Sequence, residues 1–218
     1  MKTLIAIPMK DLPHAKSRLS PVLDAAQRQR IVFDLFQRTL QFFNSHFPAC
    51  DVAVVTSSAA IAVRARAAGA RVLHELADAG LNAAATVAAD WAMAHDYQRL
   101  IVVPADIPVL LRAEVDSLLH LAQRCQMVIA EARDGGTNML LLSPPQAIVF
   151  QYGIDSARKH EQYAMAHGMT VQRCYLPFIG HDLDTPADLL VLSQTLAANA
   201  ALAAGQSTGQ RHASGALP

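Results

Sequence analysis

The sequence predicts an α/β fold in which a central, mostly parallel sheet lies between two layers of helices. Short apolar runs typical of buried strands recur along the chain, and most intervals between them have helical periodicity, as repeated strand-helix-strand units require. A length of 218 residues suits one domain with a substantial core. We therefore expect a single domain over residues 1–204 and a mobile tail over residues 205–218, which has too few apolar residues to pack.

Strand and helix alternate through the first half of the chain. The expected strands are short apolar runs, in order Thr3–Ile7, Val52–Val55, Arg71–Leu73 and Leu100–Val103. The first helix, Ala25–Phe47, has apolar residues at spacings of one, three and four along one face and polar residues on the other. The second, Ala59–Ala68, is followed by Gly69, which can take a positive φ and close the last turn. The third runs from about Asn82 to His95.

The second half departs from this alternation. A helix over Arg112–Arg124 and a strand over Met127–Ala130 continue it, but the turn residues 134–138 and the short apolar run Met139–Leu142 then interrupt the pattern. We interpret this segment as an insertion rather than as another strand-helix repeat. A helix near Asp155–His167, whose first residues carry side chains able to cap it, and a strand near Thr170–Cys174 follow.

A final helix is expected from Thr185 to about Ala204. Thr185 can act as its cap, and Pro186 suits the first helical position because the missing N–H is not needed there. Asp188 is placed favourably near the positive end of the helix dipole.

Composition excludes several classes of partner. Lysine plus arginine and aspartate plus glutamate number 18 each, so no overall field would attract nucleic acid or an anionic membrane. The N-terminus has no signal-peptide pattern, and no apolar stretch approaches the roughly 18 to 20 residues of a membrane span, so we expect a cytoplasmic protein. The three cysteines lack the paired spacing of a zinc or dithiol site. Any anionic ligand must therefore be bound locally.

The segment after the first strand is the strongest candidate for such binding. Lys10, Lys16 and Arg18 lie on a loop that leaves the carboxyl end of a buried strand, which is where open α/β sheets bind their ligands. We interpret it as a phosphate-binding loop. It contains no glycine, and the chain has no Walker A sequence, so neither a P-loop ATPase nor a dinucleotide-binding Rossmann site is supported.

Two acidic motifs complement these cations. Asp106 follows an apolar strand, and Asp182 and Asp184 end another expected strand. Magnesium prefers a few carboxylate oxygens, with phosphate and water completing its octahedron, so the motifs suit a Mg²⁺ site. A structural role for Asp106 as a turn cap remains open. We rank Asp182 ahead of Asp184 as a ligand because Asp184 lies close enough to the last helix to act structurally.

Further polar residues occur at turns and helix starts. Asn82 follows Gly80-Leu81 at the start of a helix, where its simplest role is that of an N-cap. Thr137, Gly153 and Ser156 lie at turns and a helix start whose free backbone N–H groups could bind the oxyanion of an acceptor. The nearby histidines, His14, His160 and His181, lack metal-ligand spacing and are expected to be hydrogen-bonding neighbours.

Taken in order, these motifs resemble the guanylyltransferase family of coenzyme F-420 biosynthesis, whose members use 2-phospho-L-lactate, phosphoenolpyruvate or 3-phospho-D-glycerate. The resemblance extends from about Lys2 to Leu192. Its most specific pieces are Pro8-Met9-Lys10, Ala15-Lys16-Ser17-Arg18-Leu19, Gly80-Leu81-Asn82, Pro104-Ala105-Asp106-Ile107-Pro108, Gly136-Thr137-Asn138, Tyr152-Gly153-Ile154-Asp155-Ser156 with His160, and Asp182-Leu183-Asp184-Thr185-Pro186.

This resemblance implies a nucleotidyltransferase fold of the sugar-nucleotide type, GTP as donor, Mg²⁺ as cofactor and a small phosphorylated carboxylic acid as acceptor. It implies that Asp106 and Asp182, with Asp184 beside them, hold the metal. The nucleotide would contact residues of the first loop and of the two later motifs: Pro8, Lys10, Lys16, Asn82 and Asp106. Of the cations, Lys10, Lys16 and Arg18 would take part in catalysis with Asp106, and the acceptor would contact Thr137, Gly153 and Ser156.

Two alternatives remain open from the sequence. One is a different nucleotidyltransferase, such as a molybdopterin guanylyl- or cytidylyltransferase, although the glycine- and arginine-rich first loop of those enzymes is missing. The other is a non-catalytic nucleotide-binding module. We also expect a homodimer, because the apolar run Met139–Leu142 could bury surface against a second copy.

Overall fold

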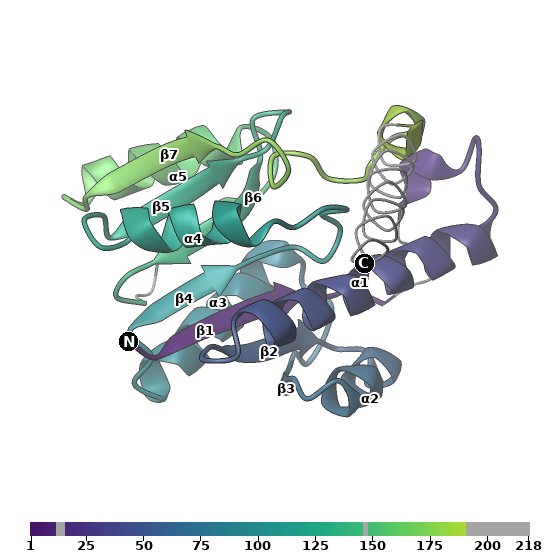
Figure 1. The fold of residues 1–218 in the computed structure, drawn as a ribbon, viewed down its shortest axis with the longest axis horizontal. Helices are drawn as coiled ribbons and strands as arrows, with labels where there is room; N and C mark the ends of the chain where they lie inside the picture. The colour runs from purple at the N-terminus through teal and green to yellow at the C-terminus, as the bar shows by residue number, and fades with distance from the viewer. Residues whose placement is uncertain (12–15, 146–147, 191–218) are drawn as a thin grey trace, which may run out of the picture.

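The computed structural model describes residues 1–11, 16–145 and 148–190. Its strands are β1 (Thr3–Pro8), β2 (Asp51–Thr56), β3 (Arg71–His74), β4 (Arg99–Val102), β5 (Met127–Glu131), β6 (Thr137–Leu142) and β7 (Val171–Tyr175). Its helices are α1 (Ala25–His46), α2 (Ala59–Ala67), α3 (Leu81–Ala94), α4 (Arg112–Leu121) and α5 (Ser156–Ala166), with a short 3-10 turn, η2 (Ser17–Leu19). The predicted alternation of strand and helix is therefore confirmed (Figure 1).

All seven strands form one sheet, in the order β3-β2-β1-β4-β6-β5-β7. β6 is antiparallel to both of its neighbours, whereas every other pair in the sheet is parallel. The segment that we predicted to be an insertion is thus a central strand, and all six of its residues are buried. Because Met139–Leu142 pack within the sheet, they cannot cover a second copy, and the expected homodimer loses that support.

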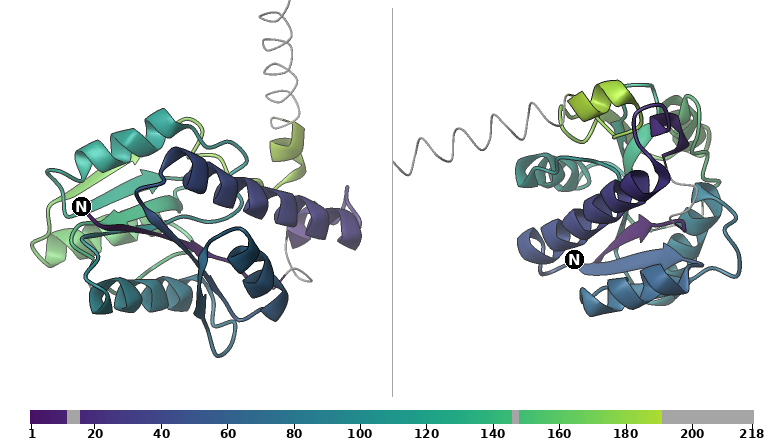
Figure 2. Two further views of the ribbon diagram at one scale, coloured as in Figure 1. Left: turned by 60° about the horizontal axis from the view of Figure 1, so that its bottom comes forward. Right: turned by 90° about the vertical axis from the view of Figure 1, so that its right-hand side faces the viewer.

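Two apolar layers hold helices against opposite faces of the sheet. On β1, Ile5 and Ile7 face a cluster that includes buried residues of α1, α2 and α4, while Leu4 and Ala6 face a cluster with α3 and α5. Neighbouring residues of a strand point to opposite faces, so a run buried on both sides is the pattern of an interior parallel strand. Figure 2 shows the resulting three layers.

Several predicted boundaries correspond closely to the structure. Gly69 has a φ of 81° and follows the end of α2, where its N–H bonds the carbonyl of Arg66. α5 begins at Ser156, but the preceding Asp155 takes a left-handed φ of 55° and its side chain makes no capping bond. The last helix begins at residue 186 and is described as far as residue 190, so its predicted end at Ala204 and the tail lie outside the described residues.

The sheet topology places the ligand-binding edge. β1 and β4 are adjacent and parallel, so the loops after their carboxyl ends leave on the same side. β6 runs in the opposite direction, so its first residue, Thr137, lies at that same edge. Within the described residues, none of the helices combines the length and the apolar character that crossing a bilayer requires.

Candidate functional site

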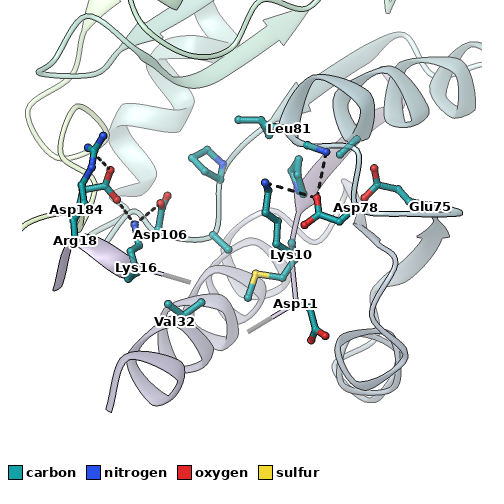
Figure 3. Close-up of a pocket in the computed structure, with 16 residues that line it drawn as sticks. Lys10, Asp11, Lys16, Arg18, Val32, Glu75, Asp78, Leu81, Asp106 and Asp184 are labelled. Carbon is teal, nitrogen blue, oxygen red and sulfur yellow. Dashed lines mark hydrogen bonds and ion pairs between the residues drawn. The ribbon is translucent and has the colours of Figure 1, made fainter. Parts of the chain in front are cut away.

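The loops at this edge of the sheet enclose a cavity of about 610 Å³. Its wall is formed by Pro8, Met9, Lys10, Asp11, Lys16, Arg18, Val32, Glu75, Asp78, Gly80, Leu81, Ala84, Pro104, Ala105, Asp106 and Asp184. The three predicted cations and two of the predicted carboxylates therefore border one cavity (Figure 3). Its size and position fit a ligand bound at the carboxyl ends of an α/β sheet.

Lys16 joins the first loop to both acidic motifs. Its Nζ lies 2.6 Å from Oδ2 of Asp106 and 2.5 Å from Oδ1 of Asp184, and its side chain is only 9% exposed. Burial disfavours the ammonium charge, but attraction and hydrogen bonds to the two carboxylates outweigh it, so the pKa of Lys16 is raised. The residue takes a left-handed φ of 54°, which is uncommon for a residue other than glycine and is often found at functional sites.

Three carboxylates gather beside this ammonium group. One oxygen each from Asp106, Asp182 and Asp184 lies within 4.8 Å of the others. Burial, together with the charges of the other two aspartates, raises the pKa of Asp182 to about 6. The second oxygen of Asp106, Oδ1, is buried and makes no hydrogen bond among the described residues. A hard divalent cation would satisfy that oxygen and relieve the repulsion, so these residues fit the expected Mg²⁺.

Main-chain and capping bonds fix the acidic motifs together. The N–H of Leu183 donates to the carbonyl of Asp106 at 3.1 Å. The carboxylate of Asp188 accepts from the backbone N–H groups of Asp184 and Thr185, which caps the helix that begins at residue 186. Asp188 therefore performs the structural role that we considered for Asp184, whose own carboxylate faces the cations.

The predicted position of the second acidic motif at a strand end was wrong. β7 ends at Tyr175, and a turn over residues 177–180 separates it from Asp182. The side-chain amide of Asn138 donates to the carbonyl of Ile179 at 2.8 Å, and so ties this connecting segment to β6. The motif reaches Asp106 through this tethered segment rather than by continuing a strand.

The other two cations differ in their surroundings. Nη1 of Arg18 lies 3.7 Å from Asp184, and the side chain is 75% exposed. Nζ of Lys10 lies 3.7 Å from Oδ1 of Asp78, on the other side of the cavity from Lys16 (Figure 3). Exposed pairs at such distances contribute little to stability, so both cations can exchange partners for an anionic ligand at small cost.

Glu75 and Asp78 are cavity residues that the sequence analysis did not identify. They follow β3, whose carboxyl end lies at the same edge of the sheet as that of β1. Burial and the neighbouring charge of Asp78 raise the pKa of Glu75. Their position after a parallel strand was the available sequence signal, because such loops converge on the ligand.

Asn82 lies at the second helical position of α3, so it is not the N-cap, which is Gly80. Its Oδ1 accepts from the N–H of Tyr152 at 2.7 Å, and its Nδ2 donates to the carbonyl of Tyr152 at 3.4 Å. The side chain thus connects the helix that borders the cavity to the loop before α5. The predicted contact between Asn82 and the nucleotide stays a prediction.

Two of the three predicted acceptor residues, Thr137 and Ser156, meet beside the buried His160. Oγ1 of Thr137 lies 3.1 Å from Oγ of Ser156 and 3.1 Å from Nδ1 of His160. Gly153 precedes Ser156 in an exposed turn and has a φ of 126°. The prediction of free backbone N–H groups at this helix start was wrong in part. The N–H of Ser156 donates to the carbonyl of Gly153, and the N–H of Ala157 donates to the carbonyl of Gly135. Both hydroxyl residues are buried, and the hydroxyl of Ser156 donates to that of Thr137.

His160 and His181 act as hydrogen-bonding neighbours of these motifs, as predicted. His160 bonds Thr137 and the backbone of Gln151, and Nδ1 of His181 lies 2.7 Å from the carbonyl of Pro177. His14 lies outside the described residues. Together, this edge of the sheet carries cations for a polyphosphate, carboxylates for a divalent ion and a pair of hydroxyl groups at the start of β6 and α5.

The chain matches known proteins along nearly all of its length. Residues 2–195 match the family model described as guanylyl transferase CofC like. The chain is 42% identical to a 3-phospho-D-glycerate guanylyltransferase from Colwellia psychrerythraea, with 88% of this chain and 92% of that protein covered. It is 34% identical to a phosphoenolpyruvate guanylyltransferase from Rubrobacter xylanophilus, with 87% and 92% covered.

A solved structure supports the same fold. A protein from Desulfovibrio desulfuricans, described as a nucleotide-diphospho-sugar transferase, superimposes with a TM-score of 0.71 at 17% identity, over 89% of this chain and 88% of that one. At that identity the likeness concerns the fold alone, and it confirms the predicted nucleotidyltransferase architecture. The sequence matches go further: this chain belongs to the CofC-like guanylyl transferase family and is a nucleotidyltransferase.

Proposed function

We propose that this enzyme transfers GMP from GTP to a small phosphorylated carboxylic acid and releases pyrophosphate. The observation that carries the proposal is the single cavity in which Lys10, Lys16 and Arg18 lie together with Asp106 and Asp184. A nucleoside triphosphate with a divalent ion needs this combination of charges. Because the named relatives act on 3-phospho-D-glycerate and phosphoenolpyruvate, an acid that carries one phosphate and one carboxylate is the proposed acceptor.

In this proposal, Asp106, Asp182 and Asp184 hold Mg²⁺. Their grouped oxygens and the unpartnered Oδ1 of Asp106 support that role. When bound, the ion supplies positive charge that polarises phosphate oxygens. The raised pKa of Asp182, about 6, implies that this site takes up a cation most readily above that pH.

The protein residues align the reactants and neutralise charge. Lys16 is buried and already bonded to the acidic motifs, so it is placed to balance charge on the phosphate undergoing substitution. Lys10 and Arg18, which are more exposed, bind the remaining phosphates as they enter. Pro8 and the main chain of Gly80 border the nucleotide.

No protein base is needed for the attack. A phosphate monoester carries about −1.5 to −2 charge near neutral pH, so the acceptor oxygen is already a nucleophile. We propose that Thr137, Gly153 and Ser156 hold the acceptor so that this oxygen faces the α-phosphorus of GTP. The bond from the α-phosphorus to this oxygen then forms as the bond to pyrophosphate breaks.

The test is a competition between acceptors. Equal concentrations of 3-phospho-D-glycerate, phosphoenolpyruvate and 2-phospho-L-lactate are incubated with GTP, Mg²⁺ and the enzyme, and the products are identified by mass spectrometry. We expect one guanylylated acid and an equal amount of pyrophosphate, with 3-phospho-D-glycerate as the first candidate because of the 42% identical relative. Release of pyrophosphate that is independent of all three acids would contradict the proposal.

The resemblance of the motifs further places this reaction in coenzyme F-420 biosynthesis. A cytoplasmic location remains a prediction from the sequence. The expected homodimer was based on Met139–Leu142, which lie within the sheet, so it now depends on experiment alone. Sedimentation of the purified protein would test the dimer directly.

A further inference from the structure

His160 is fully buried and forms two side-chain hydrogen bonds. Its Nε2 accepts from the backbone N–H of Gln151 at 3.0 Å, and its Nδ1 lies 3.1 Å from Oγ1 of Thr137. Burial lowers its pKa to about 4, so the ring is neutral at pH 7 and carries one proton. The edge of the Tyr152 ring packs against it with centroids 5.0 Å apart, which fixes the orientation of the imidazole.

The backbone bond selects the tautomer of this ring. A main-chain N–H can only donate, so Nε2 of His160 must present its lone pair to Gln151. The single proton of the neutral ring is therefore on Nδ1, and Nδ1–H donates to Thr137. The hydroxyl oxygen of Thr137 is an acceptor in this bond.

The tautomer leaves one hydroxyl proton unused. Thr137 and Ser156 have two hydroxyl protons, and the bond between their oxygens uses one of them. Neither hydroxyl makes a further hydrogen bond among the described residues. With the proton on Nε2 instead, Thr137 would donate to the ring and Ser156 to Thr137, and no proton would remain.

This hydroxyl pair lies at the same edge of the sheet as the acid cluster. Val102, the last residue of β4, pairs with Leu140 in antiparallel register, so Thr137 at the start of β6 lies at the edge of the sheet where the loop with Asp106 leaves β4. Asn138, the next residue, is tied to the segment that leads to Asp182. An anion bound to the unused proton would therefore lie at the same edge of the sheet as the proposed metal site.

The loop before α5 is held by the same histidine. Gln151 is bonded by His160, and the next residue, Tyr152, is bonded through its backbone by Asn82. This loop carries Gly153, whose φ of 126° is a conformation that other residues rarely adopt. His160 thus orders both the turn and the hydroxyl pair.

We infer that His160 is a positioning residue of the acceptor site, which holds the Thr137–Ser156 pair so that one hydroxyl donates to an anionic oxygen of the acceptor. The inference rests on the proposed function, because that function supplies the acceptor. His160 itself touches neither reactant in this arrangement and exchanges no proton. Its effect is to keep the hydroxyl pair from donating to the ring, and to order the turn.

The first test is the tautomer itself, which does not depend on activity. Two-dimensional ¹H–¹⁵N spectra of protein labelled on the histidine ring nitrogens distinguish a protonated nitrogen from one that carries a lone pair, and His160→Phe identifies the resonances by their loss. We expect Nδ1 protonated and Nε2 unprotonated from pH 6 to pH 8. An Nε2–H tautomer or a doubly protonated ring would overturn the inference.

The second test separates acceptor binding from nucleotide binding. His160→Phe and Thr137→Val should each raise KM for the acceptor acid by about tenfold to a hundredfold, the range expected for a lost hydrogen bond to a charged group, with GTP affinity within twofold. In the Thr137→Val background, His160→Phe should have a clearly smaller effect, because the two act through one hydroxyl. Thr137→Ser, which keeps the hydroxyl, should retain most of the wild-type affinity.

His167→Phe is the matched control. His167 follows the last residue of the same helix and is exposed, and its ring contacts Tyr163, by a hydrogen bond to the carbonyl and by stacking on the ring. This control variant should leave KM for the acceptor unchanged.

Equal effects of His160→Phe on KM for the acceptor, with and without Thr137→Val, would overturn the inference, even in an active enzyme. If the wild-type protein guanylylates none of the three acids, the proposed function fails instead, and the ring spectrum still tests the hydrogen-bond arrangement. If His160→Phe does not fold, Thr137→Val and Thr137→Ser give the acceptor readout.

Discussion

Nζ of Lys16 lies 2.6 Å from Oδ2 of Asp106, although the two residues are 90 positions apart in the chain. The same ammonium group contacts Asp184, so one buried cation offsets part of the repulsion among three neighbouring carboxylates. A divalent ion would offset the same repulsion. Lys16 and the metal therefore both stabilise the acidic cluster by supplying positive charge. The stability of the metal-free protein should depend more on Lys16 than that of the metal-bound protein does.

Lys16→Met tests this dependence. The variant keeps an apolar stem of similar length but removes the charge, so the carboxylates lose their buried partner. We expect the metal-free protein to lose about 1 to 2 kcal/mol of stability, less than for a fully buried pair because Asp106 and Asp184 are partly exposed. Thermal unfolding should show a Tm lower by roughly 2 to 8 °C.

Magnesium should reduce this deficit, because it supplies the missing positive charge. The matched control is Arg18→Met, since Arg18 contacts Asp184 at 3.7 Å from a largely exposed position and should shift Tm very little. Equal Tm changes in the two variants, or a Lys16→Met deficit that Mg²⁺ leaves unchanged, would contradict the interpretation.

Asp106→Asn tests the proposed metal ligand. The amide keeps the shape of the side chain but removes the charge and adds a donor toward the position of the cation. We expect pyrophosphate release with GTP and acceptor to fall by about a hundredfold to a thousandfold, as for other losses of preorganised electrostatic stabilisation. Tm should change much less, because relief of carboxylate repulsion partly offsets the weakened bond to Lys16.

Asp34→Asn, on the exposed side of α1, is the control for this substitution and should behave as the wild type. Near-normal pyrophosphate release by Asp106→Asn would remove Asp106 from the catalytic site. A large loss of Tm would instead assign it a mainly structural role.

The sequence predicted the parallel part of the fold because those strands are continuous apolar runs separated by amphipathic helices. It did not predict β6, because a short run such as Met139–Leu142 reveals burial but not strand direction. The turn before β6 reverses the direction of the chain after β5. The antiparallel pairing of β6 with β4 depends on contacts between residues distant in sequence.

A similar distinction applies to the site. Lys16, Arg18 and Asp106 could be predicted because charged residues after strands converge at one edge of a parallel sheet. Asp184 does not follow a strand, and a connecting segment tied to β6 by Asn138 brings it to the site instead. The bond between Asn82 and Tyr152 could not be, since it spans 70 positions and depends on how two loops pack. The role of Asp188 was partly visible, because its spacing from Thr185 is that of a capping pair.

Asp182→Asn tests the pH dependence of stability. Without metal, the pKa of Asp182 is raised from 3.8 to about 6, so the folded state binds its proton more tightly than the unfolded state does. The contribution of this group to stability is therefore lost as pH rises from about 4 to above 6. Asparagine stays neutral, so the variant should match the wild type near pH 4 and exceed its stability at pH 7 to 8.

The measurement is urea unfolding in a chelator at several pH values, with the difference between the two proteins as the readout. Most other carboxylates titrate alike in both proteins, so their contributions to the free energy of unfolding cancel in that difference. With Mg²⁺ at pH 8, the order should reverse, because only the wild type has all three charged ligands and so binds the ion more tightly. A stability difference that does not vary with pH would show that Asp182 ionises as a solvated aspartate does.

Asn82→Ala tests whether the loop before α5 serves the acceptor. The substitution leaves the N–H and carbonyl of Tyr152 without their side-chain partner and should cost about 1 to 2 kcal/mol. Because this loop carries Gly153, we expect KM for the acceptor to rise by about tenfold, with KM for GTP within twofold. Steady-state kinetics with each substrate varied in turn provides the measurement.

Asn44→Ala is the matched control, since Asn44 also donates its side-chain amide to a distant backbone carbonyl, that of Ala68, but lies on α1 outside the cavity. It should lower stability slightly and change neither KM. A rise confined to KM for GTP in Asn82→Ala would support the nucleotide contact predicted from the sequence. A rise confined to KM for the acceptor would show that Asn82 acts through Tyr152, as the two hydrogen bonds between them require.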